Sequence, residues 1–104
     1  MKTLQEVYDI IDYNNEEAHQ QAWDIWVSAD ELMESEDEAD WETAEEIREE
    51  ASQEQASYFR DLYYMLDEED QESIKHWLKQ DEDFKESFSM YFGEEQFAEE
   101  FDNG

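Results

Sequence analysis

The residues best suited to metal chemistry in this chain are two histidines, each with a glutamate nearby. Glu16 precedes His19 by three positions, the spacing of the Glu-x-x-His motif in carboxylate-bridged dimetal bundles. Such a site needs a second Glu-x-x-His, but Glu72 precedes His76 by four positions, so the second motif is missing. We therefore predict that His19 is a partly exposed histidine on an acidic helix, and keep a metal-binding carboxylate enzyme as a remote alternative.

Other common catalytic arrangements are missing from the sequence. The chain has no cysteine, no serine in a Gly-x-Ser-x-Gly setting, and only two glycines, too few for a phosphate-binding loop. The acidic stretches 67–73 and 81–87 lack the glycine that a calcium-binding loop needs at its sixth position. Pairs of carboxylates for acid–base catalysis arise by chance in so acidic a chain and carry no specific signal. We expect a protein that is not an enzyme, with no catalytic residue, no metal ligand and no cofactor.

The charge balance is the most unusual property of the chain. There are 34 acidic residues against 6 basic ones, for a net charge of −28 among 104 residues. High net charge with low hydropathy is typical of disordered chains. Against disorder stand 16 aromatic residues, the absence of proline, and apolar residues that recur at helical spacing. We therefore predict a folded domain whose stability rises with salt, because salt screens the repulsion.

The apolar spacing predicts an all-α fold: one small bundle of five or six helices over residues 1–104, with a strongly acidic surface. A capping box of Thr3 and Glu6 predicts a short first helix over 4–13, which ends at a turn formed by Asn14 and Asn15.

The later helices have their own start and stop signals. A second helix is expected over 16–34, with Ser35 or Asp40 as the cap of a third helix that reaches Leu66. The acidic run 67–70 starts a fourth helix. Asp81 is the expected cap of a fifth helix over 82–92, which Gly93 ends, and a last turn or two uses Phe97 and Phe101.

The third helix explains why residues 34–46 combine eight carboxylates with a tryptophan and two alanines. At 100° per residue, one face is apolar and the opposite half is acidic, with Trp41 at the border. The predicted core face is Ala44, Ile47, Ala51, Tyr58, Leu62, Met65 and Leu66, and the acidic half is Glu42, Glu45, Glu46, Glu49, Glu50, Glu54 and Asp61.

Three apolar side chains fall outside the predicted core faces: Trp23 and Val27 in the second helix, and Tyr64 in the third. Either another helix covers them, or they are exposed anchors for a partner or for a homodimer.

The acidic surface suggests the imitation of a polyanion. Duplex DNA carries one charge per ~1.7 Å of its axis. A compact domain of this length is about 33 Å across, so 28 net charges give a linear density of the same order. The predicted partner-binding residues are Asp30, Glu31, Glu34, Glu36, Asp37, Glu38, Asp40, Glu42, Glu45, Glu46, Glu49, Glu50 and Tyr64.

In these respects the chain resembles the DNA-mimic inhibitors of phages and mobile elements, which are acidic anti-restriction and anti-CRISPR proteins. The resemblance covers the whole chain and is one of composition and pattern, without a shared motif. It implies an inhibitor that occupies the basic DNA-binding groove of a bacterial defence enzyme, a CRISPR effector or a restriction enzyme. It implies no direct binding of nucleic acid by the protein itself.

Other interpretations of the charge remain open. An acidic chaperone or decoy for a basic nucleic-acid-binding protein shares the same electrostatics, and a solvated surface or adaptation to high salt also produces acidic faces. The N-terminal residues lack the apolar run of a signal peptide, and no stretch has the ~20 apolar residues of a membrane span. We expect a cytoplasmic protein, located in a bacterial host cell, that does not bind membranes.

Overall fold

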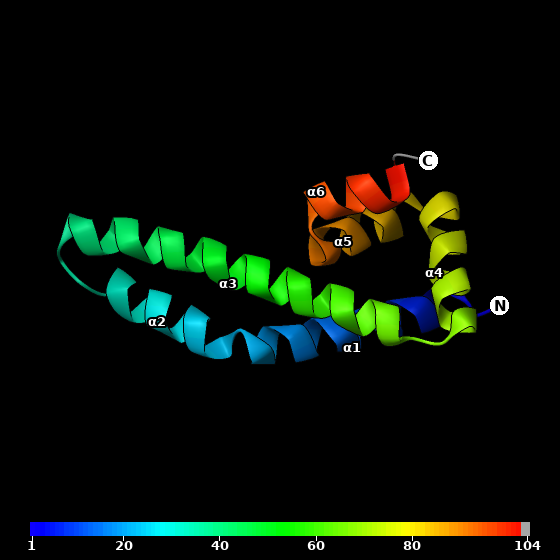
Figure 1. The fold of residues 1–104 in the computed structure, drawn as a ribbon, viewed down its shortest axis with the longest axis horizontal. Coiled ribbons are helices and arrows are strands. Elements are labelled where there is room, and N and C mark those ends of the chain that lie inside the picture. The colour runs from blue at the N-terminus through cyan, green and yellow to red at the C-terminus, as the bar shows by residue number, and fades with distance from the viewer. Residues whose placement is uncertain (103–104) are drawn as a thin grey trace.

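The computed structural model describes residues 1–102, and every regular element in this part of the chain is helical. The predicted all-α fold is therefore confirmed. Residues 1–102 form six α-helices and a final π-helical segment, η1; Figure 1 shows how the helices are arranged. In chain order the elements are α1 (Leu4–Gln21), α2 (Trp23–Met33), α3 (Glu38–Met65), α4 (Glu68–Gln80), α5 (Glu82–Phe92), α6 (Glu94–Phe97) and η1 (Ala98–Asp102).

The molecule is elongated, with principal extents of 52 × 25 × 20 Å. Figure 1 shows that α3 runs along most of this length, with α1 and α2 antiparallel beside it, while α4, α5 and α6 gather near one end. We call residues 16–57 the arm and the other described residues the head. The expected diameter of about 33 Å is wrong, because a two-helix arm projects from the head instead of folding back on it.

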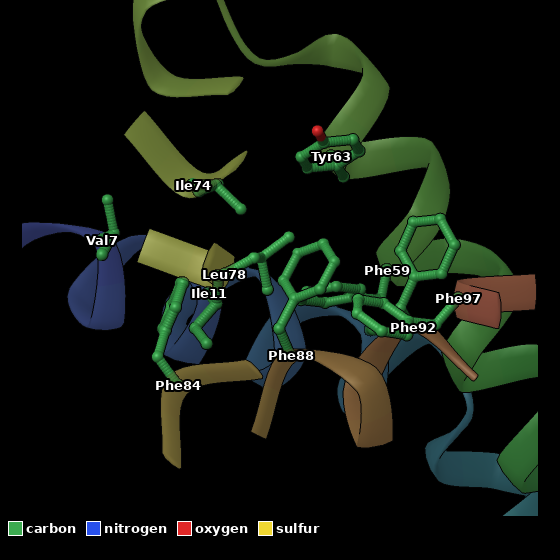
Figure 2. Packing of buried hydrophobic residues seen from close by; sticks show 11 residues of the cluster. Val7, Ile11, Phe59, Tyr63, Ile74, Leu78, Phe84, Phe88, Phe92 and Phe97 are labelled. Carbon is green, nitrogen blue, oxygen red and sulfur yellow. The ribbon is translucent and has the colours of Figure 1, made fainter. Parts of the chain in front are cut away.

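Aromatic side chains from α3, α5 and α6 form the core of the head. The Phe88 ring is central: its centroid lies 5.7 Å from that of Phe59, 5.4 Å from Phe92 and 5.9 Å from Phe97. These rings are almost fully buried, and each buried phenylalanine contributes about 1.5–3 kcal/mol. Figure 2 shows the cluster together with its aliphatic neighbours from α1 and α4, which are Val7, Ile11, Ile74 and Leu78.

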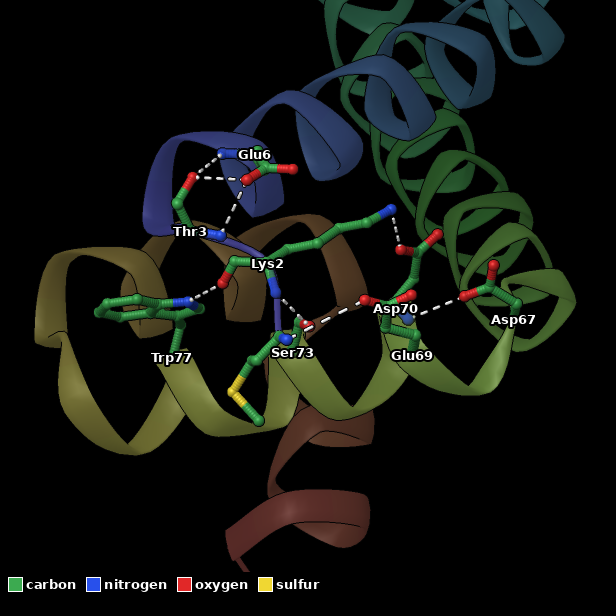
Figure 3. Close-up of polar contacts among 9 residues, drawn as sticks. Lys2, Thr3, Glu6, Asp67, Glu69, Asp70, Ser73 and Trp77 are labelled. Atoms are coloured by element: carbon green, nitrogen blue, oxygen red, sulfur yellow. Dashed lines mark hydrogen bonds and ion pairs between the residues drawn. The ribbon is translucent and has the colours of Figure 1, made fainter.

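The N-terminal residues are attached to α4. The backbone N–H of Lys2 donates to Ser73 Oγ at 3.0 Å, and the Trp77 indole N–H donates to the Lys2 carbonyl at 2.9 Å (Figure 3). The Lys2 ammonium also forms an ion pair with Asp70. These contacts join positions more than 65 residues apart in the sequence. They therefore connect the two chain segments that form the head, one before the arm and one after it.

Most helix boundaries in the head follow the predicted signals. The capping box is present: the Glu6 N–H donates to Thr3 Oγ1, and the Thr3 N–H donates to Glu6 Oε1, each at 3.2 Å. The hydrogen bonds from Thr3 lower the pKa of the Glu6 carboxyl. Asp81 caps α5 by accepting from the Phe84 N–H at 2.9 Å, and Gly93 ends that helix with a φ of +99°.

The predicted turn at Asn14 and Asn15 is wrong. The first helix continues to Gln21, and the chain bends instead at Ala22, where no side chain caps α2. Asn14 is buried on the helix, and Asn15 Oδ1 accepts a hydrogen bond of 3.0 Å from the Gln55 side chain of α3. This packing against α3 compensates for the modest helix propensity of asparagine.

The start of α3 also differs from the prediction. Asp37 is the N-cap, because its carboxylate accepts from the Ala39 N–H at 3.0 Å, whereas Ser35 and Asp40 form a side-chain hydrogen bond with each other at 2.7 Å.

The predicted core face of α3 is correct in the arm and partly wrong in the head. Ala44 and Ala51 are fully buried, but Met65 is 80% exposed, while Phe59 and Tyr63 were missed and are buried. On an ideal helix the buried direction moves by about 100° between Ala44 and Tyr63. It moves because α3 packs against α2 in the arm and against α5 in the head.

None of the helices within residues 1–102 combines the length and the apolar character needed to cross a membrane.

Candidate functional site

The arm carries the most one-sided charge of the molecule. Residues 16–57 contain 16 carboxylates and a single basic residue, Arg48, whereas the remaining 18 carboxylates share the rest of the chain with the other five basic residues. Arg48 lies 3.3 Å from Asp30, in an ion pair with both side chains well exposed. Such a pair contributes at most about 1 kcal/mol, so it leaves the arm as a nearly uncompensated acidic surface.

Buried alanines allow the helices that carry this charge to pack closely together. Four alanines of the arm have no exposed surface: Ala22 at the bend between α1 and α2, Ala29 on α2, and Ala44 and Ala51 on α3. Ala44 and Ala51 are seven residues apart, which places both on one face of α3, as in a coiled coil. Alanine at a helix contact permits close approach of the two backbones. The carboxylates of both helices therefore project from one narrow rod.

Twelve of the predicted partner-binding residues are carboxylates of the arm, and eleven of these are exposed. Asp40 is half-buried and accepts the Ser35 hydrogen bond, and Asp37 has a structural role as the cap of α3. A central group on α3 consists of Glu42, Glu45, Glu46, Glu49 and Glu50. Within the described part of the chain, none of these five side chains forms a hydrogen bond or an ion pair. They are available to a partner.

The structure does not place Tyr64 with these carboxylates. Tyr64 lies in the head, 14 residues beyond Glu50, or about 21 Å further along α3. Its ring is 51% exposed and packs against Phe92 at 6.3 Å between centroids. Tyr64 is therefore not part of the arm surface.

The exposed aromatic residues of the arm are Trp23, which is 55% exposed, and Trp41. Trp23 packs edge-on against His19, with ring centroids 5.6 Å apart, and Val27 is half-buried. No helix covers Trp23 fully, so it has the exposure expected of an anchor.

Trp41 closes the tip of the arm. Its indole N–H donates to the Ser35 carbonyl at 2.6 Å, and the Asp37 N–H donates to Ser35 Oγ at 3.2 Å. The tryptophan in the acidic run thus holds the connection between α2 and α3 in one shape. The acidic run is therefore part of the folded arm, with its connection closed by these hydrogen bonds.

A polar cluster at the base of the arm explains the role of His19. Gln55 Oε1 accepts from the Trp26 indole N–H at 3.1 Å and lies 3.2 Å from His19 Nδ1. Residues 1–102 contain no group of three or more histidine, cysteine, aspartate or glutamate side chains arranged to hold a metal ion. The position of His19 is that of a packing residue between helices.

Sequence reasoning missed a cavity in the head. A pocket of about 560 Å³ lies between the end of α3, α4, α5 and the C-terminal turns. Three of the six basic residues of the chain line it, namely Lys75, Lys79 and Lys85. The i, i+4 spacing of Lys75 and Lys79 was the available signal, but only the fold adds Lys85 from the next helix.

The arm thus presents a row of exposed carboxylates on folded helices. Comparison with protein-family models, with curated proteins and with solved structures finds no match for the chain.

Proposed function

We propose that the protein is a DNA mimic that inhibits a bacterial nucleic-acid enzyme, such as a restriction enzyme or a CRISPR effector. In this proposal the arm enters the DNA-binding groove of the enzyme and presents carboxylates where the phosphates of DNA would lie. The observation that carries the proposal is the arm itself: a narrow helical projection, formed by the end of α1, α2 and most of α3, with 16 carboxylates and a single arginine.

The linear charge density supports this function. A net charge of −28 over a length of 52 Å corresponds to one charge per ~1.9 Å, against ~1.7 Å for duplex DNA. The longer shape brings the density closer to that of DNA than a compact domain about 33 Å across would.

The helical structure of the arm supports it further. A disordered acidic tail loses conformational entropy when it binds, but the arm already holds its carboxylates on formed helices. Electrostatic steering by so large a charge accelerates association with a basic groove, and this acceleration weakens as salt increases. The complex should therefore form rapidly and be sensitive to ionic strength.

A capture experiment tests the proposal. The protein is immobilised without a charged tag, bacterial lysate is passed over it at low and at high salt, and the retained proteins are identified. We expect one or a few DNA-binding enzymes that a short DNA duplex displaces and whose activity the free protein inhibits. Equal retention of many basic proteins, without inhibition of an enzyme, would favour an acidic decoy instead.

Two matched variants locate the binding surface. The arm variant replaces Glu42, Glu45, Glu46 and Glu49 by glutamine. The head variant makes the same change at four exposed glutamates, Glu72, Glu86, Glu95 and Glu99. Both remove four negative charges and keep side-chain size.

We expect the arm variant to bind the enzyme several hundred-fold more weakly, at about 1 kcal/mol per lost contact, and the head variant to bind nearly as well as the wild type. Equal losses in both variants would contradict a specific role of the arm. A gel-shift assay should show no binding of DNA or RNA by the protein itself, and direct binding would overturn the proposal.

A further inference from the structure

The cavity in the head differs in charge from the rest of the molecule. Its lining includes three lysines and two glutamates, Glu82 and Glu100, in a chain where acidic residues outnumber basic ones by 34 to 6. Half of the basic residues of the chain therefore meet at one hollow of an otherwise acidic protein.

Two of these lysines have no ion-pair partner in the described part of the chain. Lys75 and Lys79 are exposed on α4, and no carboxylate within residues 1–102 lies within 4 Å of either ammonium. They are four residues apart, so their side chains are neighbours on the helix surface, and such like-charged pairs are slightly unfavourable. An anion between them would relieve this repulsion. The third lysine, Lys85, comes from α5, and its Nζ lies 5.9 Å from the centre of the Phe97 ring.

Part of the cavity lining is apolar and aromatic. Phe97 and Phe101 stack with their centroids 5.1 Å apart, and both line the cavity, as does Leu78 of α4. A flat apolar group would fit against these two rings, while the lysines would hold its negative charge. Pockets that bind small organic ligands typically have volumes of about 300–1,000 Å³, a range that includes this cavity.

A buried hydroxyl group gives an independent sign of a missing partner. Tyr63, which also lines the cavity, is 2% exposed, and its hydroxyl has no hydrogen-bond partner within residues 1–102. Figure 2 shows the hydroxyl directed away from Phe59 and the phenylalanine cluster. Buried hydroxyl groups in proteins are nearly always hydrogen-bonded, because an unpaired one loses its hydrogen bonds to water without replacement. A bound ligand with an acceptor atom would supply the partner.

We propose that the cavity between α3, α4, α5 and the C-terminal turns binds a small aromatic carboxylate, with its ring against Phe97 and Phe101 and its carboxylate at Lys75 and Lys79. A single negative charge is preferred over a phosphate dianion, because Glu82 and Glu100 lie in the same lining and would repel a second charge. This binding is separate from the proposed function of the arm.

Calorimetric titration tests the proposal with three probes at 0.15 M salt: 2-naphthoate, its neutral analogue 2-naphthylmethanol, and inorganic phosphate. We expect 2-naphthoate to bind one to one, with a dissociation constant on the order of 0.1 mM. The neutral analogue should bind at least tenfold more weakly, and phosphate should not saturate. No saturation by 2-naphthoate up to millimolar concentration, or equal affinity for the neutral analogue, would overturn the proposal.

Variants show where the probe binds. Replacing Lys75 and Lys79 by glutamine should weaken 2-naphthoate binding at least tenfold, whereas Arg48→Gln, the control on the arm, should leave it unchanged. Tyr63→Phe should weaken binding several-fold without lowering the melting temperature. Insensitivity to the lysine change would contradict the proposed site. Sedimentation of the same samples would show whether the lysines instead bind the acidic arm of a second copy, an outcome that also overturns the proposal.

The arm variant separates this inference from the proposed function. It should bind 2-naphthoate as the wild type does, because its changed residues all lie in the arm.

Discussion

The indole N–H of Trp41 donates a hydrogen bond of 2.6 Å to the backbone carbonyl of Ser35, across the connection between α2 and α3. This contact joins the first turn of the long helix α3 to the segment that connects it to α2. It explains why a large aromatic residue lies within the most acidic stretch of the chain. The charge of residues 34–46 would drive the tip of the arm apart, and the tryptophan holds it closed.

Replacing Trp41 by phenylalanine should loosen the tip of the arm. The change keeps an aromatic ring but removes the donor, which costs about 1 kcal/mol for a hydrogen bond of this kind. Hydrogen exchange should show faster exchange of the amides over residues 34–41, with little change in the head. Trp23→Phe is the control, because the Trp23 indole N–H has no hydrogen bond within the described residues, and equal acceleration in both variants would contradict the role of Trp41.

Replacing Gly93 by alanine should destabilise the head. The φ of Gly93 is +99°, which side chains rarely adopt, and an added Cβ would lie 3.1 Å from Arg60 Nη1. The Arg60 guanidinium donates to the Phe92 carbonyl at 2.7 Å, so the clash would also disturb the end of α5. We expect a loss of at least about 1–2 kcal/mol in the free energy of unfolding, measured by urea denaturation. Ala98→Gly is the control, because Ala98 is exposed and its position requires neither a positive φ nor a close contact with Arg60. If Gly93→Ala left the free energy of unfolding unchanged, the local backbone would have adapted to the side chain, against this prediction.

Salt should stabilise the fold. Repulsion among 34 carboxylates opposes folding, and it is screened over about 10 Å at 0.1 M salt. Circular dichroism should show a mostly helical spectrum and a melting temperature that climbs from low to moderate ionic strength. The arm variant should have a higher melting temperature than the wild type at low salt, and the difference should shrink at high salt. A coil spectrum at every salt concentration would contradict a folded arm.

High pH should unfold the protein, in part through Tyr63. Burial raises the pKa of the Tyr63 phenol from its ordinary value of 10 to about 12. Because the folded pKa is the higher one, the neutral phenol favours the folded state: its contribution to stability is complete below pH 10 and is lost as the pH rises through about 12. Burial also raises the pKa of Tyr8, Tyr64 and Tyr91, which act in the same direction.

The variant Tyr63→Phe isolates this contribution. Its stability should decline less steeply between pH 10 and pH 12 than that of the wild type, as measured by urea denaturation at fixed salt. Identical slopes would mean that Tyr63 ionises without a cost to the fold. Below pH 10 the variant should be at least as stable as the wild type, because it removes an unpaired buried hydroxyl.

Local signals in the sequence were sufficient to predict several helix boundaries of the head. Thr3 with Glu6, Asp81 and Gly93 act through hydrogen bonds and backbone angles within a few residues of themselves, so their effect does not depend on distant packing. The acidic half of the third helix was also predictable, because helical period and composition fix which side chains share a face. For the same reason, eleven of the twelve proposed arm carboxylates are exposed as their pattern indicated.

Tertiary packing decided where the first helix bends, which face of α3 is buried and how the helices are arranged. Asn14 and Asn15 indicate a turn by propensity, but Asn14 is buried and Asn15 accepts a hydrogen bond from Gln55 of α3, and the helix continues to a bend at Ala22. The buried face of α3 changes direction because its partner changes, so a single helical wheel placed Met65 inside and missed Phe59 and Tyr63. The elongated shape, the separation of Tyr64 from the arm, and the meeting of Lys75 and Lys79 with Lys85 all depend on contacts between residues far apart in the chain. The sequence by itself determined the helices and their charge, because these are local properties, whereas only the fold determined which faces meet, because burial depends on the partner that each face finds.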